Sequence, residues 1–206
     1  MAVTLERTTR ETRMRCTLAI DPPSGSARVE VSTGIGFLDH LLAALATHAG
    51  WSVSLCADGD LEVDDHHTAE DAAILLGQAI DIELGDRSGR ARFGFAYAPL
   101  DESLARAVVD LVRRPSARVD LGLRREMLGA LATENITHVL ETLAFEARCT
   151  MHIDVLAGTN DHHRAEAAFK ALALAFAMAL APGASASTKG TLIDRAERAS
   201  GSDARC

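Results

Sequence analysis

Aromatic residues are scarce in this 206-residue chain: they make up 4% of it, with one Trp and one Tyr. So few rings argue against a surface on which nucleic-acid bases stack. A basic excess is also missing, because the formal net charge is −8. That charge argues against nonspecific binding to nucleic acid or to anionic membranes. A phosphorylated small molecule is still compatible with it, if a few Arg and Lys side chains gather locally.

Paired cysteines and long apolar runs are lacking as well. The four cysteines have neither paired nor Cys-x-x-Cys spacing, so neither a disulfide framework nor a thiolate zinc site is expected. Residues 1–15 are charged and lack the apolar core of a signal peptide. The longest apolar run, 165–181, is mostly Ala and contains Lys170, which is too polar for a membrane span. The sequence therefore predicts a cytoplasmic protein in which this run is a buried helix.

What the chain does contain is a set of metal-ligand residues that occurs twice, about 96 residues apart. In each copy a single His precedes the pattern His-His-x-x-Glu by about 25 residues, and six of the eight histidines belong to it. The candidate ligands are His40, His66, His67, Glu70, His138, His162, His163 and Glu166. Six imidazoles and two carboxylates have the right count for two metal sites, each with three His and one Glu.

Helical periodicity divides these ligands between two directions. Residues four apart share a helix face, so His66 with Glu70, and their counterparts in the second copy, can each bind one ion from a single turn. The adjacent His67 and His163 point about 100° away, toward a different ion. Imidazoles together with carboxylates suit a first-row divalent metal and disfavour Mg²⁺ or Ca²⁺. Which first-row metal binds is left open by the ligand types alone.

The hydrophobic periodicities predict an α+β fold. Helices are expected at 37–49, 66–84, 133–147 and from residue 162, and strands at 14–20, 28–32, 51–55, 61–63, 93–98, 105–111, 117–121 and 149–155. The first two strands flank a turn at 21–25 and are expected to form an antiparallel hairpin. Each half repeats the order strands, helix, strands, helix, which predicts a duplicated two-layer sandwich. We expect the first repeat at 1–90, the second at 91–190, and a polar tail at 191–206.

At these residues the chain resembles the imidazoleglycerol-phosphate dehydratase family of histidine biosynthesis. The similarity runs from about residue 7 to residue 190. The matching strings are Phe37-Leu-Asp-His40, Asp64-Asp-His-His-Thr-Ala-Glu-Asp71, Arg92-Phe-Gly94, Pro99-Leu-Asp-Glu102, Leu156-Ala-Gly-Thr-Asn-Asp-His-His163, Glu166-Ala-Ala-Phe-Lys170 and Ser187-Thr-Lys-Gly190.

The resemblance implies a lyase that removes water from D-erythro-imidazole-glycerol phosphate to give imidazole-acetol phosphate, with two Mn ions per active site. It implies a fold of the ribosomal protein S5 domain 2-like type, and a homo-oligomeric shell of twenty-four subunits built from trimers that share active sites. It also implies that the eight candidate ligands bind the metals and that Glu11 is the catalytic acid/base. The implied contacts to the substrate and its phosphate are Glu11, Arg92, Arg114, Lys170, Ser187 and Lys189.

The chain departs from the family pattern at a few positions. The usual Gly-Arg-Pro is Arg113-Arg114-Pro115, which leaves open which Arg enters the site. Phe95 stands where an Asp is usual, Thr137 where a Glu often precedes the His, and Thr188 where the tail usually has a second Ser. None of these departures removes a metal ligand, so they bear on the shape of the pocket.

Two other classes of protein also use many His and Glu side chains. A dinuclear metallohydrolase usually has more carboxylates than this set of six His and two Glu. A ferritin-like storage bundle uses Glu-x-x-His pairs, whereas the order here is reversed, and the strand-like alternation at 51–55 and 151–155 opposes an all-helical bundle.

Overall fold

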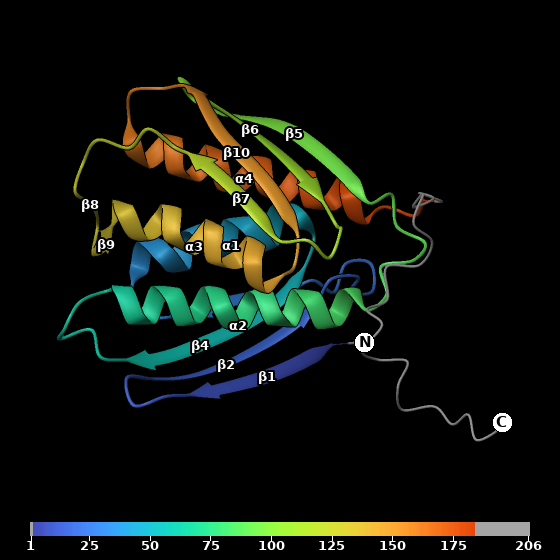
Figure 1. The fold of residues 1–206 in the computed structure, drawn as a ribbon. Coiled ribbons are helices and arrows are strands. Elements are labelled where there is room, and N and C mark those ends of the chain that lie inside the picture. Colours follow the sequence, from blue (N-terminus) through green and yellow to red (C-terminus); the bar gives the residue numbers. More distant parts are fainter. Residues whose placement is uncertain (1, 184–206) are drawn as a thin grey trace, which may run out of the picture.

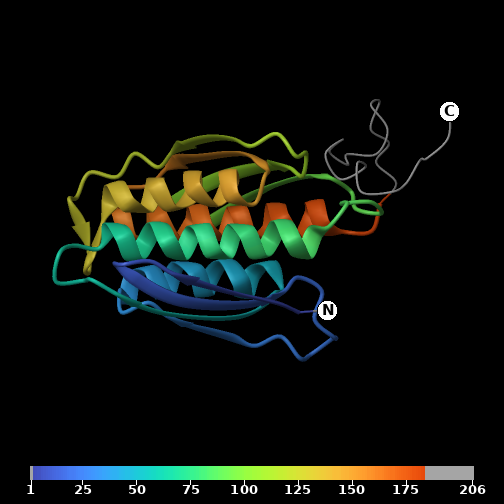
Figure 2. The same ribbon diagram turned by 60° about the horizontal axis from the view of Figure 1, so that its bottom comes forward.

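The computed structural model describes residues 2–183, in which two four-stranded sheets enclose a layer of four helices (Figures 1 and 2). The first half contains β1 (Val3–Thr8), β2 (Thr12–Ala19), β3 (Val29–Ser32), α1 (Gly36–Ala49), β4 (Ser52–Gly59) and α2 (His66–Leu84). The second half contains β5 (Phe93–Leu100), β6 (Ser103–Asp110), β7 (Ser116–Asp120), the short hairpin β8 (Met127–Leu128) and β9 (Leu131–Ala132), α3 (Thr133–Glu146), β10 (Thr150–Ala157) and α4 (Asp161–Leu180).

The two sheets have the same topology. Their strand orders are β1-β2-β4-β3 and β5-β6-β10-β7, and in each the fourth strand of the order pairs parallel while the other pairs are antiparallel. The order of helices and strands also repeats, apart from the β8–β9 hairpin inserted before α3. These observations confirm the predicted duplicated α+β fold.

Three predictions about the first sheet are wrong. Strand β3 does not form a hairpin with β2 but pairs parallel with β4, because the hairpin partner of β2 is β1. No strand was expected at β1, although its burial alternates between half-buried and exposed positions. Residues 61–63 form a turn instead of continuing the sheet, and the side chains of Leu61 and Val63 are exposed.

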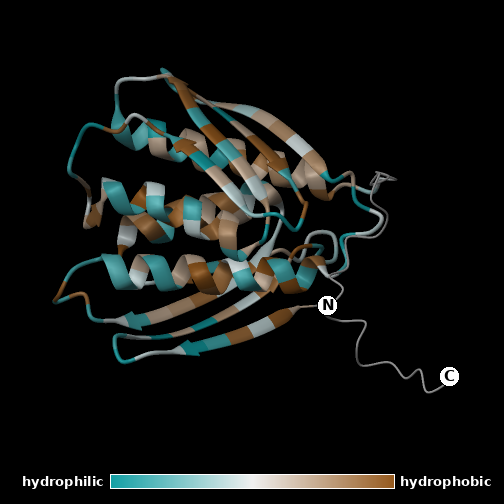
Figure 3. Ribbon diagram, viewed as in Figure 1, coloured by the Kyte–Doolittle hydropathy of each residue, from teal (hydrophilic) through white to brown (hydrophobic). Residues whose placement is uncertain are grey.

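The four helices pack in two pairs, each of which joins the two repeats. Helix α1 packs on α4, and α2 packs on α3. All four helices begin at the same end of the molecule, at the left of Figure 1. The beginnings of α2, α3 and α4 are hydrophilic in Figure 3, whereas buried Leu and Ala side chains fill the middle of the layer. Within residues 2–183 no helix is long and apolar enough to cross a membrane.

The opposite end of the helix layer contains a buried arginine. The side chain of Arg87 is 1% exposed and forms an ion pair with Asp81 near the end of α2. Its guanidinium also donates hydrogen bonds of 2.8 Å to the carbonyl oxygens of Leu111, Ala147 and Arg148. These carbonyls belong to the second repeat, so Arg87 links the end of the first repeat to the end of α3.

We expect Arg87→Met to lower the free energy of unfolding by about 3–5 kcal/mol, because it leaves a charged partner and buried carbonyls unpaired. Urea denaturation at a fixed protein concentration measures the change. A suitable control is Arg15→Gln, since Arg15 and Glu6 form an exposed pair 3.7 Å apart that contributes less than about 1 kcal/mol. Equal denaturation midpoints for the two variants would contradict the linking role of Arg87.

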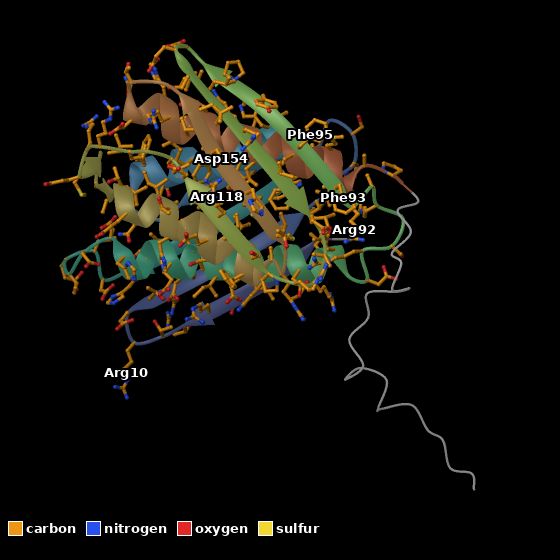
Figure 4. The ribbon with its side chains drawn as sticks, turned by 45° about the horizontal axis from the view of Figure 1, so that its top comes forward. Arg10, Arg92, Phe93, Phe95, Arg118 and Asp154 are labelled. Atoms are coloured by element: carbon orange, nitrogen blue, oxygen red, sulfur yellow. The ribbon has the colours of Figure 1, made fainter. Side chains whose placement is uncertain are left out.

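The outer face of the second sheet combines apolar and charged side chains (Figure 4). Phe93, Phe95 and Tyr97 of β5 are each more than half exposed. Farther across the face, Asp154 of β10 forms ion pairs with Arg106 of β6 and Arg118 of β7. A row of exposed aromatic residues on an edge strand is typical of a surface that contacts another protein.

Candidate metal centre

The first cluster of candidate ligands contains His66 and Glu70 from α2 and His138 from α3. One possible ligand atom of each lies within 4.8 Å of the others. The His138 Nε2 atom is 2.9 Å from Glu70 Oε1, and the rings of His66 and His138 stack with their centroids 5.0 Å apart. The His66 Nδ1 atom is 2.8 Å from Oδ1 of the buried Asn135, which leaves Nε2 of His66 available to a ligand.

The second cluster contains His40 from α1 and His162 and Glu166 from α4. The Glu166 Oε2 atom is 3.0 Å from His40 Nε2 and 3.3 Å from His162 Nε2, while Oε1 is 2.7 Å from Lys170 Nζ. Burial opposes ionisation of Glu166, but hydrogen bonds from Lys170 and His40 lower its pKa to about 2. The cluster therefore has an ionised carboxylate between two imidazoles.

Each cluster takes residues from both repeats, which the spacing in the sequence does not reveal. The single His of the first repeat, His40, joins the His-x-x-x-Glu pair of the second repeat, and His138 joins the pair of the first. The cause is the helix pairing, because α1 packs on α4 and α2 packs on α3. Since all four helices begin at one end, both clusters lie in the first two turns of their helices, at the same end of the molecule.

His67 and His163 stand outside both clusters, as their different direction on the helix predicts. The His67 Nδ1 atom is 3.0 Å from Asp60 Oδ2, and His163 Nδ1 is 2.7 Å from Glu102 Oε2. These hydrogen bonds to carboxylates raise the pKa of both imidazoles. Each cluster within one chain therefore has two His and one Glu, one imidazole fewer than the count of three that the sequence analysis expects per site.

Glu11 lies beside His67 in the turn between β1 and β2. Its carboxylate is 3.9 Å from His67 Nδ1 and half exposed. The backbone N–H of Asp60 donates a hydrogen bond to the Glu11 carbonyl oxygen, and the Glu11 backbone N–H donates to Thr9 Oγ1. The structure thus brings the predicted acid/base to the same end of the molecule as the candidate ligands.

The predicted phosphate contacts do not all lie at this end. Lys170 contacts Glu166, whereas Arg92 lies at the far end of β5, with its guanidinium bound by both carboxylate oxygens of Asp110. Figure 4 shows Arg92 and Arg10, the neighbour of Glu11, at opposite ends of the molecule. Arg114 is on the Arg92 side, because Thr150, whose hydroxyl donates to the Arg114 carbonyl, pairs with Asp110. Ser187 and Lys189 lie outside the described residues.

The separation of the two ends is too large for one small substrate. The Arg92 backbone N–H donates to the carbonyl of Ala179, which is seventeen residues after His162 on α4. At 1.5 Å per residue, that length of helix spans about 25 Å. A single molecule of substrate therefore cannot contact both Arg92 and the His162 cluster of the same chain.

The neighbouring Arg113 and Arg114 differ in their surroundings. The Arg113 side chain is 17% exposed, donates a hydrogen bond of 3.0 Å to the Gly85 carbonyl and lies 3.7 Å from Asp81. The side chain of Arg114 is exposed to solvent. The Arg113 guanidinium is thus held by groups at the end of α2, and Arg114 is the one of the two that is accessible to a ligand.

A duplicated α+β sandwich with two His-His-Glu clusters at one end has a ligand set typical of enzymes with a divalent-metal centre. A family model described as imidazoleglycerol-phosphate dehydratase matches residues 33–176. Imidazoleglycerol-phosphate dehydratases from Neurospora crassa and Candida glabrata are each 52% identical to the chain, over 90% and 86% of it and 93% and 92% of their own lengths. A crystal structure of the Staphylococcus aureus enzyme superposes with a TM-score of 0.79 at 34% identity and covers 89% of this chain and 100% of its own.

A second structure, from Pyrococcus furiosus, superposes with a TM-score of 0.76 at 33% identity and covers 91% of this chain and 99% of its own. The chain belongs to the imidazoleglycerol-phosphate dehydratase family. It is therefore a hydro-lyase of histidine biosynthesis. Family membership excludes the metallohydrolase alternative, and the two sheets exclude the storage bundle.

Proposed function

We propose that the enzyme removes water from D-erythro-imidazole-glycerol phosphate to give imidazole-acetol phosphate at active sites that are completed only between chains and contain two Mn²⁺ ions each. The separation of about 25 Å between the ligand clusters and Arg92 carries this proposal. If Arg92 and Arg114 bind the phosphate, as the family resemblance implies, they must do so for a site whose ligand clusters belong to other chains.

The donor set supports the metal part of the proposal. Two imidazoles and one carboxylate converge in each cluster. The outward His67 and His163 form no hydrogen bond at Nε2 within residues 2–183, so these atoms can complete a cluster of a neighbouring chain. The two His and one Glu that each cluster contains within one chain suit Mn²⁺ as well as other first-row divalent ions. Bound ions would supply Lewis-acid stabilisation of charge on the substrate's imidazole ring.

Glu11 supplies the proton transfer in this proposal. The hydrogen to be removed lies on a carbon without an adjacent carbonyl group, so it is only weakly acidic, and electron density must pass through the imidazole ring to expel the hydroxyl group. The Glu11 carboxylate takes the carbon-bound proton and returns it to the ring-adjacent carbon when the resulting enol becomes a ketone. The enol gives up its O–H proton in that step, and this proton and the expelled hydroxide together make the water that leaves. Its hydrogen-bonded turn fixes it beside His67, within the group of candidate ligands.

The phosphate is bound at the other end by positive charge. The exposed Arg114 presents a guanidinium group that matches a phosphate in geometry and charge. The guanidinium of Arg92 is bound by both carboxylate oxygens of Asp110, so its proposed contact with the phosphate rests on the resemblance. Lys170 lies at the cluster end, where it forms an ion pair with Glu166, and its proposed contact with the substrate rests on the resemblance. The proposed role of Ser187 and Lys189 as further phosphate contacts rests on the resemblance.

A homo-oligomer is supported by two surfaces of the chain. His67 and His163 use Nδ1 for their hydrogen bonds to Asp60 and Glu102, which leaves Nε2 for a neighbouring chain, and the aromatic row of β5 is exposed. A cytoplasmic location is supported by the three cysteines among residues 2–183, which are all free. Burial raises the pKa of the thiols of Cys16 and Cys149 to about 12, so both stay protonated.

Removal of divalent ions tests the shared site. If ions join the chains, their binding free energy appears as assembly free energy, and EDTA should convert a large particle into smaller units. The mass should fall by about eightfold if a shell of twenty-four chains separates into trimers. Light scattering at equal concentration, before EDTA, after it and after added MnCl₂, measures the change alongside dehydratase activity. An unchanged mass together with lost activity would show that the ions do not join chains.

A further inference from the structure

The outward imidazoles of His67 and His163 share one contact: each has a carboxylate at Nδ1. Asp60 lies in the turn after β4, and Glu102 lies in the turn between β5 and β6. The two carboxylates are not related by the duplication, because the position 96 residues after Asp60 is Leu156. The two halves therefore reach the same contact from unrelated positions in the chain.

The arrangement determines where the ring hydrogen lies. A carboxylate accepts a hydrogen bond but donates none when ionised, so the hydrogen of each neutral imidazole must lie on Nδ1. Nε2 then carries an unprotonated lone pair, which is what a metal ion requires of an imidazole ligand. The Nδ1 acceptor of the inward His66 is, in contrast, the neutral side-chain amide of Asn135.

We propose that Asp60 and Glu102 are positioning residues that fix the tautomer and the direction of His67 and His163, so that both present an unprotonated Nε2 to an ion held by a neighbouring chain. The inference rests on the proposed role of these two histidines as ligands shared between chains. A carboxylate behind a ligating imidazole also makes the ring more basic and typically changes metal affinity by about 10–100-fold.

Glu102 is the more strongly fixed of the two residues. Its Oε1 atom accepts backbone hydrogen bonds from Asn160 at 2.8 Å and from Thr159 at 3.1 Å, while Oε2 contacts His163. The two oxygens of Glu102 thus have different hydrogen-bond partners. Asp60 has no such support, because its Oδ1 is buried and has no hydrogen-bond partner among the described residues.

Because the two Glu102 oxygens have different partners, Glu102→Gln should change the tautomer of His163 in a predictable way. The single amide oxygen of Gln is needed by the backbone N–H groups of Thr159 and Asn160, since an NH₂ group there would face two donors. The NH₂ group therefore faces His163 Nδ1, which has to accept. The ring hydrogen moves to Nε2 and blocks the atom that binds the ion, although the turn keeps its backbone hydrogen bonds.

Histidine-selective ¹³C and ¹⁵N labelling of the metal-free full-length protein reads the tautomer directly. Solid-state spectra near pH 9, well above the usual imidazole pKa of about 6.5, distinguish hydrogen on Nδ1 from hydrogen on Nε2. His163→Ala identifies the His163 signal by its loss. We expect hydrogen on Nδ1 in the wild-type protein and in Asp101→Asn, and on Nε2 in Glu102→Gln.

Asp101→Asn is the matched control, because it removes one negative charge from the same turn and leaves the Nδ1 contact intact. Its carboxylate is exposed and lies 3.7 Å from Nε2 of His163. Titration with MnCl₂ should show one of the two sites weakened by about 10–100-fold in Glu102→Gln and neither weakened to that extent in Asp101→Asn.

The possible outcomes separate the inference from the proposed function. A hydrogen on Nε2 in the wild-type protein, or Mn²⁺ affinity in Glu102→Gln equal to that of the wild type, would overturn the positioning role. A wild-type protein that binds no Mn²⁺ at all would instead refute the proposed metal centre, and the tautomer spectra would still decide whether Glu102 fixes His163.

Discussion

Glu11→Gln should lose about 10² to 10⁴-fold in turnover while it retains its metal ions and its assembly. The substitution keeps the shape of the side chain but replaces a carboxylate that can carry a proton with an amide that cannot. The carboxylate is half exposed and lies 3.9 Å from its imidazole neighbour, and the turn is fixed by backbone hydrogen bonds, so the fold does not depend on its charge. Steady-state assays with the imidazole substrate measure the loss.

The matched control for this experiment is Glu6→Gln. Glu6 lies on β1, close to the same turn, and its exposed carboxylate pairs only loosely with Arg15. Metal content measured on both variants separates loss of a proton carrier from loss of ions. Turnover of Glu11→Gln close to that of Glu6→Gln would show that another group moves the proton.

The helices were predictable because their signals are local. The apolar period over 66–84 and the glycine that follows it define α2 to the residue, and α1 begins one residue earlier than expected. The four strands of the second sheet were also found within a few residues, whereas the short β8–β9 hairpin was not expected. Each of these segments depends mainly on its own side chains, which face either the core or solvent.

The pairing of strands was less predictable, because it depends on contacts between distant segments. The turn at 21–25 suggested a hairpin, yet β3 crosses over to pair parallel with β4, so that α1 packs on the sheet between them. Leu61 and Val63 alternate like a strand but lie in a turn that leads to the ligand-bearing helix. A period of two over three residues is too short to distinguish these cases.

The candidate ligands were predictable as residue types, but their grouping into clusters was not. The His-x-x-x-Glu pairs lie on one helical face, as expected, and the adjacent histidines point away. That His40 joins the second repeat and His138 the first follows from helix packing between repeats, which no spacing encodes. Asn135, Asp60 and Glu102 were not singled out as partners of the imidazoles, although Glu102 lies in one of the strings shared with the family.

Recovery of activity from two inactive variants is the second large effect that we expect. His162→Ala removes a ligand at one end of the chain, and Arg114→Glu reverses a charge at the other. We call the end of the chain with the His-His-Glu clusters the ligand end, and the end with Arg92 and Arg114 the phosphate end. When both variants are present in one particle, some sites take the ligand end from an Arg114→Glu chain and the phosphate end from a His162→Ala chain. With random mixing at equal amounts, half of the chains supply each intact end, so about one quarter of the sites should be complete.

A matched pair of variants controls for nonspecific effects of mixing. Arg92→Glu and Arg114→Glu both change the phosphate end, since Arg92 and Arg114 lie at the same end of the second sheet. No chain in that mixture has an intact phosphate end, so no recovery is expected. Coexpression with two different tags and purification by both isolates the mixed particles in each case.

The measurement that tests the shared site most directly is therefore the dehydratase activity of particles containing both His162→Ala and Arg114→Glu chains. We predict about one quarter of wild-type activity per chain, with each parent alone close to background, and no recovery in the Arg92→Glu and Arg114→Glu mixture. Activity of the first mixture no greater than the average of its two parents would show that a single chain supplies both ends of its own site.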